Sequence, residues 1–419
     1  MSKGQRALMW LGQAVTAADN AALGRVVALL DGVRNRGEAD ALLDRARDRL
    51  RQLRPQRPLG FARLLFLPLD GAIVPPSRWR RGEGQVPRSA LPVLSELVHA
   101  ALGPEAESIA AACEGKTVED AEAVERVGAR LWTAAARGLP AVAPPEWEES
   151  GLAAADYPEI AALCRPVWAA GPALRAAATG ERTAAAAALA ALAEAGPAPF
   201  SAGLATLVEA APLPGALLRT AAGVDARFRA VVVRRAEAAL DNAPPQLDRL
   251  DAGAAAATAA ALAARLDDLE GCGLLDQAGR KRLHAQRRAA EEACRERFLA
   301  GAERQIIEPL SALAAAPEAA DAAVVEVETA ARGLARLESA GRRLGGGAYD
   351  RARAAIVESL ALLAARAKRP EGLRPMDLAR VAEILAGPEE AAAVLSRAQA
   401  AAEAQPPAGT PSGSPLPAR

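Results

Sequence analysis

The chain has 419 residues, and its 51 basic and 51 acidic side chains give a formal net charge of zero. Aromatic residues make up only 3% of the chain, and its helix-favouring Ala, Leu, Arg and Glu are abundant, so we predict an all-α protein with few strands or none. No apolar run approaches the roughly 20 residues that cross a bilayer, which predicts that there is no transmembrane segment. The N-terminal apolar stretch ends at Gly12, too early for a signal peptide, so we expect a cytoplasmic protein.

The charged residues are unevenly distributed along the first part of the chain. Residues 34–88 hold thirteen Arg against six acidic residues, whereas residues 103–160 hold twelve acidic residues against four basic ones. The basic block could bind RNA, DNA or an anionic membrane surface. Alternatively, it could dock on the acidic block that follows it. We favour docking, because a chain of zero net charge has no long-range attraction to nucleic acid. A helix is predicted at residues 38–53, where four leucines and an alanine form one stripe.

Residues 58–92 differ in composition from the rest of this alanine-rich chain. They include six Pro, five Arg, two of the five Phe and one of the five Trp. An apolar run over residues 61–69 predicts a short buried element. Pro75-Pro76, Gly82, Gly84 and Pro87 then predict a long irregular loop, within the window 68–92. Ser89 is expected to cap a helix over residues 90–102, with Pro92 in its first turn.

This loop carries the candidate binding residues. They are Arg78, Trp79, Arg80, Arg81, Arg88 and Ser89. Arginines close to a helix N-terminus could hold a phosphate or a carboxylate, and a tryptophan between arginines could stack on a base. A structural role competes with both: Trp79 would fill a gap in the helical body while the arginines remain in water. We favour the structural role.

Other possible motifs are better explained by structure. Gly115-Lys116-Thr117 lacks the upstream glycine of a phosphate-binding loop, so we interpret Gly115 as the end of a helix and residues 117–120 as the capping box of the next. The four cysteines are widely spaced and are expected to be small buried side chains. His99 and His284 lack catalytic or metal-binding neighbours. We therefore predict no metal, no cofactor and no catalytic residue.

The C-terminal half is the most regular part of the chain. Apolar residues spaced three and four apart predict long Ala-rich helices over residues 246–270, 274–308, 319–344 and 348–367. Their short, glycine-rich connections predict an antiparallel, coiled-coil-like bundle. Residues 280–304 hold eight basic and four acidic residues, which we interpret as a solvated helix face. Pro, Gly and Ser provide nine of the last fifteen residues, 405–419, so a disordered tail is expected.

These features predict an irregular helical unit over residues 1–145, a middle helical segment over 146–222, the bundle over 223–404 and the tail over 405–419. The favoured function is that of a non-enzymatic scaffold or protein-interaction protein, which could also form homo-oligomers through its C-terminal helices. The alternative is a binder of nucleic acid or an anionic membrane through residues 34–88. A third possibility is an enzyme or sensor for a small anionic ligand at Arg80, Arg81 and Arg88.

Overall fold

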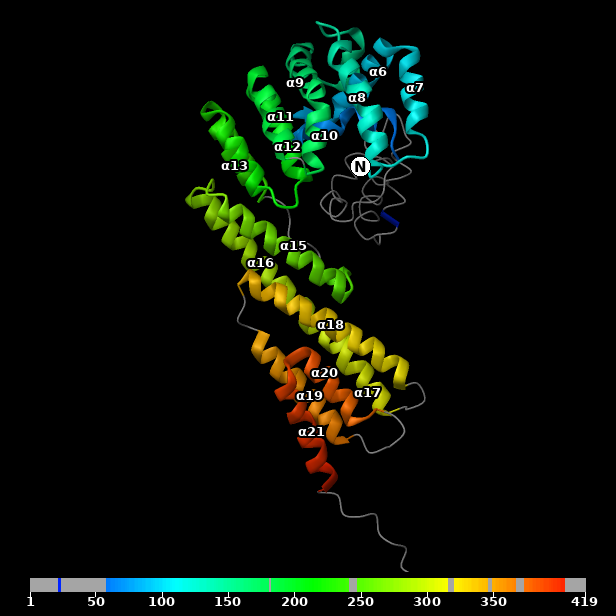
Figure 1. The fold of residues 1–419 in the computed structure, drawn as a ribbon, viewed down its shortest axis with the longest axis vertical. Helices are drawn as coiled ribbons and strands as arrows, with labels where there is room; N and C mark the ends of the chain where they lie inside the picture. The colour runs from blue at the N-terminus through cyan, green and yellow to red at the C-terminus, as the bar shows by residue number, and fades with distance from the viewer. Residues whose placement is uncertain are drawn as a thin grey trace, which may run out of the picture. The chain divides into compact units, whose positions relative to one another are not determined.

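The computed structural model describes residues 22–23, 58–180, 182–240, 247–315, 320–345, 349–366 and 373–403. These residues form seventeen α-helices and two strands of two residues each, so the protein is all-α, as its composition predicts (Figure 1). Within these ranges, no helix has the length and apolar character that a membrane span requires. The predicted helix 38–53, residues 34–57 of the Arg-rich block and the tail 405–419 lie outside the described residues.

The chain divides into two compact units. Unit 1 contains Met1–Ala243 and Arg265–Leu283, and unit 2 contains Pro244–Ala264 and His284–Arg419. Helices α15 (Ala252–Gly271) and α16 (Gln277–Ala302) therefore contribute residues to both units. The predicted domain boundaries after residues 145 and 222 lie inside unit 1, and the three-part division stays a prediction.

Unit 1 is built from short helices and 3₁₀ turns. In chain order they are α5 (Phe61–Phe66), η1 (Leu67–Ala72), η2 (Pro76–Arg78), η3 (Arg88–Ala90), α6 (Leu91–Leu102), α7 (Pro104–Cys113), α8 (Ala121–Gly138), η4 (Pro145–Ser150), η5 (Ala154–Asp156), α9 (Tyr157–Ala169), α10 (Gly171–Ala178), α11 (Arg182–Ala195), α12 (Pro197–Ala210), α13 (Gly215–Val224), η6 (Ala226–Phe228) and α14 (Arg229–Ala238). The strands β1 (Ile73–Val74) and β2 (Val86–Pro87) pair in parallel.

Three helix pairs meet at a Gly-Pro dipeptide with no further connecting residue. Gly103-Pro104 joins α6 to α7, Gly196-Pro197 joins α11 to α12, and Gly387-Pro388 joins α20 (Pro375–Ala386) to α21 (Pro388–Glu403). Each glycine has a positive φ, which L side chains rarely adopt, and each proline begins the following helix, where no intrahelical N–H bond is lost. These dipeptides let the chain change direction between consecutive helices.

The core of unit 1 surrounds α5. Leu64 and Leu65 are fully buried, and their backbone carbonyls lie in the last turn of the helix, where the carbonyl of Leu64 accepts the N–H of Leu67. Two tryptophans donate to these carbonyls from neighbouring helices: Trp132 of α8 donates its indole N–H to the carbonyl of Leu64 at 2.8 Å, and Trp168 of α9 donates to that of Leu65 at 2.9 Å. The prediction of a buried element over residues 61–69 is confirmed.

Two predicted helix starts are wrong. Helix α6 begins at Leu91 after the 3₁₀ turn η3, and no side chain caps it, so Ser89 is not its cap; Pro92 does lie in its first turn. Helix α8 begins at Ala121 instead of following Thr117. Thr117 forms an antiparallel bridge with Pro58, which holds it outside the helix, and its N–H donates to the Asp120 carboxylate at 2.9 Å.

Unit 2 contains longer helices. In addition to its parts of α15 and α16 it has α17 (Glu308–Ala315), α18 (Ala320–Leu344), α19 (Tyr349–Arg366), α20 (Pro375–Ala386) and α21 (Pro388–Glu403). Within the predicted helix 246–270, a short 3₁₀ turn, η7 (Leu247–Arg249), precedes the helix start at Ala252, where Asp251 accepts the N–H of Ala254. The predicted helix 274–308 is interrupted by a π-helical turn, η8 (Glu303–Ile307).

Two buried glutamates form ion pairs that connect the helices of unit 2. Glu338 of α18 accepts hydrogen bonds from Arg342 and from Arg353 of α19, and Arg353 also donates to the carbonyl of Ala386, the last residue of α20. Glu328 of α18 pairs with Arg380 of α20 at 3.0 Å. Helices α19, α20 and α21 all pack against one another. The antiparallel-bundle arrangement of the C-terminal helices stays a prediction.

Candidate functional site

Residues 79–85, which carry part of the predicted site, form a turn closed by Gln85. The half-buried indole of Trp79 donates to the backbone carbonyl of Gln85 at 3.3 Å. The side-chain oxygen of Gln85 accepts the backbone N–H of Arg80 at 3.1 Å. The indole N–H of Trp79 therefore closes the loop in which Trp79 lies, and it donates to an acceptor within the protein.

Arg81 is occupied by carboxylates of the acidic block. Its guanidinium pairs with Asp156 at 3.1 Å and with Glu159 at 2.9 Å, and it also donates to the carbonyl of Ala155. Asp156 is the N-cap residue of α9 and Glu159 lies in its first turn. This contact places a residue of the basic block on the acidic block, as the docking interpretation of the charge layout predicts for the part of the block that the structure describes.

The other predicted site residues are not gathered around one point. Arg78 and Arg80 are exposed, and the Arg80 guanidinium donates to the carbonyl of its neighbour Trp79 at 2.9 Å. Arg88 and Ser89 lie half-buried in η3, on the far side of β2 in the sequence. Arg81 therefore contacts the start of α9, whereas Arg88 and Ser89 precede α6. Their role in anion or partner binding stays a prediction.

The loop is anchored from a second direction. Ser201 of α12 and Arg235 of α14 both donate hydrogen bonds to the carbonyl of Glu83, at 3.2 and 3.4 Å. Arg235 also donates to the Ser201 hydroxyl oxygen at 2.9 Å. Burial lowers the pKa of the Arg235 guanidinium from its ordinary value. The turn is thus held between α9 on one side and the α12–α14 pair on the other.

The cysteines and Tyr157 are buried, whereas the two histidines are at least partly exposed. The four cysteines are free and buried, which confirms the prediction for these residues. Burial raises the pKa of the Cys294 thiol to about 11 and that of the Tyr157 phenol to about 12. His99 pairs with Glu107 and packs edge-on against Phe61, and His284 is exposed. Among described residues, no three His, Cys, Asp or Glu side chains are grouped to hold a metal ion.

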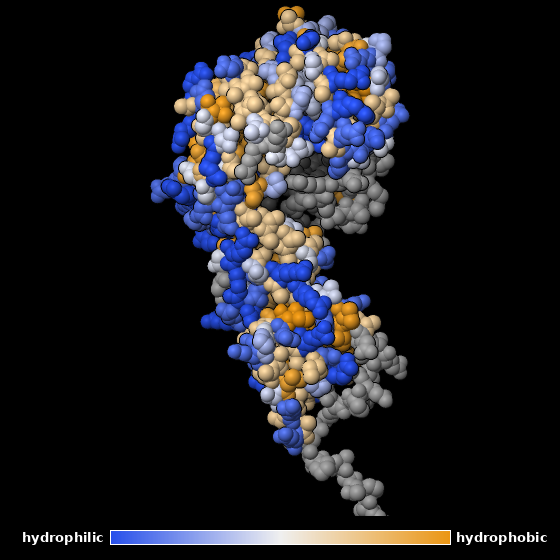
Figure 2. All heavy atoms as spheres, viewed as in Figure 1, coloured by the Kyte–Doolittle hydropathy of each residue, from blue (hydrophilic) through white to orange (hydrophobic). Residues whose placement is uncertain are grey.

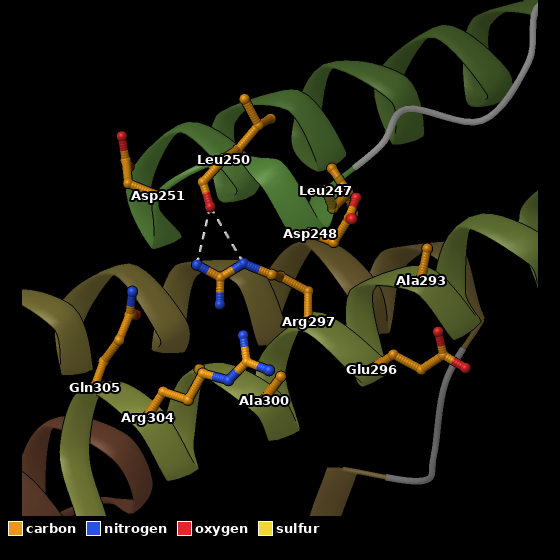
Figure 3. A pocket seen from close by; sticks show the side chains of 11 residues that line it. Leu247, Asp248, Leu250, Asp251, Ala293, Glu296, Arg297, Ala300, Arg304 and Gln305 are labelled. Atoms are coloured by element: carbon orange, nitrogen blue, oxygen red, sulfur yellow. Dashed lines mark hydrogen bonds between the residues drawn. The ribbon is translucent and has the colours of Figure 1, made fainter. Parts of the chain in front are cut away.

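Unit 2 contains an open hollow of about 660 Å³ (Figure 3). Its polar lining consists of Asp248, Asp251, Glu296, Arg297, Arg304 and Gln305. Figure 3 shows the guanidinium groups of Arg297 and Arg304 on the same side of the hollow, while the carboxylates of Asp251 and Glu296 point away from them. The hollow therefore has a local positive end although its lining includes three carboxylates.

Arg297 is the residue that distinguishes this hollow from an ordinary surface depression. Its side chain is buried, with only 9% of the residue exposed. Its Nε and Nη2 atoms both donate to the carbonyl of Leu250, at 3.3 and 2.9 Å. Neither Arg297 nor Arg304 forms an ion pair with a residue that the structure describes. A buried guanidinium that has only a carbonyl as partner keeps its positive charge uncompensated.

Arg297 and Arg304 are not among the site residues that the sequence predicts, because the mixed charges of residues 280–304 are typical of a solvated helix face. A usable signal was present. Gly301 follows Arg297 by four residues and Arg304 follows Gly301 by three, which places them on one helix face with a side-chain-free position between the two arginines. The burial of Arg297 depends on Leu250, 47 residues earlier in the chain, and that contact has no local sequence signature.

Comparison of the chain with protein-family models, with curated proteins and with solved structures found no match.

Proposed function

We propose that the protein is a non-enzymatic scaffold that self-associates through the helices of unit 2. The observation that supports this proposal is the exposure of large apolar side chains on that unit. Leu362 near the end of α19 is 50% exposed, and Met376 in the first turn of α20 is 64% exposed. Figure 2 shows apolar residues between charged ones on the visible face of α18 and α20. Helix α19 packs against α20, and α20 is the next helix along the chain, so Leu362 and Met376 belong to two neighbouring helices.

A second copy of the chain is the partner that fits this surface. The net charge of the protein is zero, so two copies approach without long-range repulsion. The exposed charges of α19 and α21 carry both signs, as in Arg351, Glu358 and Arg397, which allows complementary pairing between two copies. The free cysteines are consistent with a reducing compartment, and we place the protein in the cytoplasm.

Sedimentation analysis of three proteins tests the proposal. The natural chain should form dimers or larger assemblies at micromolar concentration. The double variant Leu362→Glu, Met376→Glu should have a dissociation constant roughly tenfold higher or be monomeric, because two charges would be buried at the contact between copies. The control is Val142→Glu, which changes an apolar residue of unit 1 that is 74% exposed, and it should assemble like the natural chain. A natural chain that is monomeric at every concentration tested would overturn the proposal.

A further inference from the structure

The hollow of unit 2 has an electrostatic property that the scaffold proposal does not use. Arg297 and Arg304 are both on the segment formed by α16 and η8, and both line the hollow. Two guanidiniums facing the same space repel each other, and the repulsion is stronger where one of them is shielded from water. A bound anion would remove this repulsion and would also compensate the buried charge of Arg297.

The geometry around Arg297 leaves one nitrogen available. Nε and Nη2 are both directed at the carbonyl of Leu250, which fixes the plane of the guanidinium. Nη1 lies over Gly301, where a Cβ atom would approach to 2.7 Å. No described residue accepts a hydrogen bond from this nitrogen. The absence of a side chain at Gly301 therefore gives the guanidinium its place and leaves Nη1 beside the hollow.

A third polar residue of the hollow has a buried atom without a hydrogen-bond partner. The side-chain oxygen of Gln305 is buried and accepts no hydrogen bond. Gln305 and Arg304 lie in the π-helical turn η8, and single π-turns occur frequently at functional sites. Arg297, Arg304 and Gln305 thus line the same space from one helical segment.

We propose that this hollow binds the phosphate group of a small phosphorylated molecule, held by Arg297 and Arg304 with the Gln305 amide as a further donor. A phosphate fits better than a single carboxylate, because its charge approaches two and its oxygens can accept from both guanidiniums at once. The volume of about 660 Å³ is within the range of small-molecule sites and leaves room beyond the phosphate. There Asp248, Asp251 and Glu296 would favour hydroxyl or amino groups of the ligand.

Phosphorus NMR with inorganic phosphate as the probe tests this site. Titration of the natural chain should broaden the phosphate signal and give a dissociation constant. Arg304→Gln should weaken binding roughly tenfold or more, because one charge-assisted contact is lost. Arg304 is exposed, so its replacement is not expected to disturb the fold, which far-UV circular dichroism checks. The matched control Arg336→Gln removes an exposed arginine of α18 outside the hollow and should bind phosphate like the natural chain.

Several outcomes would overturn the proposal: no binding by the natural chain, equal loss in Arg304→Gln and Arg336→Gln, or unchanged binding in Arg304→Gln. If acetate at the same ionic strength binds as tightly as phosphate, the assignment to phosphate is wrong. Should Arg304→Gln fail to fold, Arg304→Lys takes its place, with weaker but measurable binding expected. The Leu362→Glu, Met376→Glu variant should bind phosphate normally, so this test is independent of self-association.

Discussion

Many arginine side chains of this protein bind backbone carbonyls at helix ends. Arg165 donates to the carbonyls of Leu139 and Pro140 after α8, Arg219 to that of Gly271 at the end of α15, and Arg265 to that of Ala211 after α12. The last carbonyls of a helix lack intrahelical partners and carry the negative end of its dipole, so a cation there is favourable. Some of the many arginines therefore stabilise helix ends by donating to carbonyls that have no intrahelical partner.

Arg353 gives this role its clearest test. One nitrogen of its guanidinium donates to Glu338 at 3.3 Å and another to the carbonyl of Ala386 at 2.8 Å, so a planar fork joins three helices. A lysine ammonium at this position cannot satisfy both acceptors in the same geometry. We expect Arg353→Lys to lower the free energy of unfolding by about 1–2 kcal/mol in urea denaturation. Arg351 is an exposed neighbour on α19, and Arg351→Lys should change the free energy of unfolding by less than about 0.5 kcal/mol. Equal effects of the two variants would contradict a stabilising role of the Arg353 guanidinium between the three helices.

In unit 1 the indole groups of two tryptophans test how much a hydrogen bond from a side chain to a backbone carbonyl contributes to stability. In Trp168→Phe the buried carbonyl of Leu65 would lose its donor and a small cavity would form, so we expect a loss of roughly 2–4 kcal/mol in urea denaturation followed by circular dichroism. Trp79→Phe removes a comparable indole bond, but this bond lies in a half-buried loop where water can replace the donor. It should cost less than about 1 kcal/mol. If both variants lose the same free energy of unfolding, the indole bond of Trp168 to α5 stabilises the protein no more than the indole bond of Trp79 in the loop.

At the level of elements, the existence of the helices could be predicted but several of their ends could not. Thr117 and Ser89 are both of a residue type that commonly caps helices. Thr117 is nevertheless held by a bridge to Pro58, and Ser89 lies in a 3₁₀ turn that follows the pairing of β1 with β2. These contacts join residues far apart in sequence, and local capping preferences do not report them. The same limit applies to the candidate sites: Arg81 meets carboxylates 75 and 78 residues later, and Arg297 meets a carbonyl 47 residues earlier.

The Gly-Pro dipeptides between consecutive helices are a feature of the elements that can be recognised in the sequence. Gly196 has a φ of 120° and a ψ of −179°, a region open to glycine almost alone, and a Cβ there would meet no atom within 4 Å. We expect Gly196→Ala to lose about 1–3 kcal/mol of stability through backbone strain only. Gly223→Ala in α13 also meets no atom within 4 Å but has no positive φ, and it should be neutral or stabilising by up to about 1 kcal/mol. Thermal unfolding of both variants gives the comparison, and equal destabilisation would argue against strain at the joint.

At the scale of the whole molecule, both units bury weak acids in their neutral forms. In unit 1 burial raises the pKa values of Cys113, Cys164 and Tyr157, and in unit 2 it raises those of Cys294 and Tyr349. In the unfolded chain these groups release their protons at ordinary values of about 9 for a thiol and 10 for a phenol. The native protein keeps its protons to higher pH. The stability that this difference contributes is fully present below about pH 9 and is lost as pH rises toward the native pKa values, about 11 for Cys294 and 12 for Tyr157.

The alkaline loss of stability can be assigned to individual groups by its slope. Between pH 10 and 11 each phenol that is ionised only in the unfolded chain lowers the free energy of unfolding by about 1.4 kcal/mol per pH unit. Tyr157→Phe removes one such group together with the hydrogen bond from its hydroxyl to the carbonyl of Pro140. The lost bond should lower stability by a similar amount at every pH, whereas the lost titration should make the decline between pH 10 and 11 shallower by up to about 1.4 kcal/mol per unit. Urea denaturation at pH 8, 9, 10 and 11 separates the two effects. Parallel curves for the variant and the natural chain would show that Tyr157 ionises alike in both states, and its burial would then not contribute to the alkaline loss.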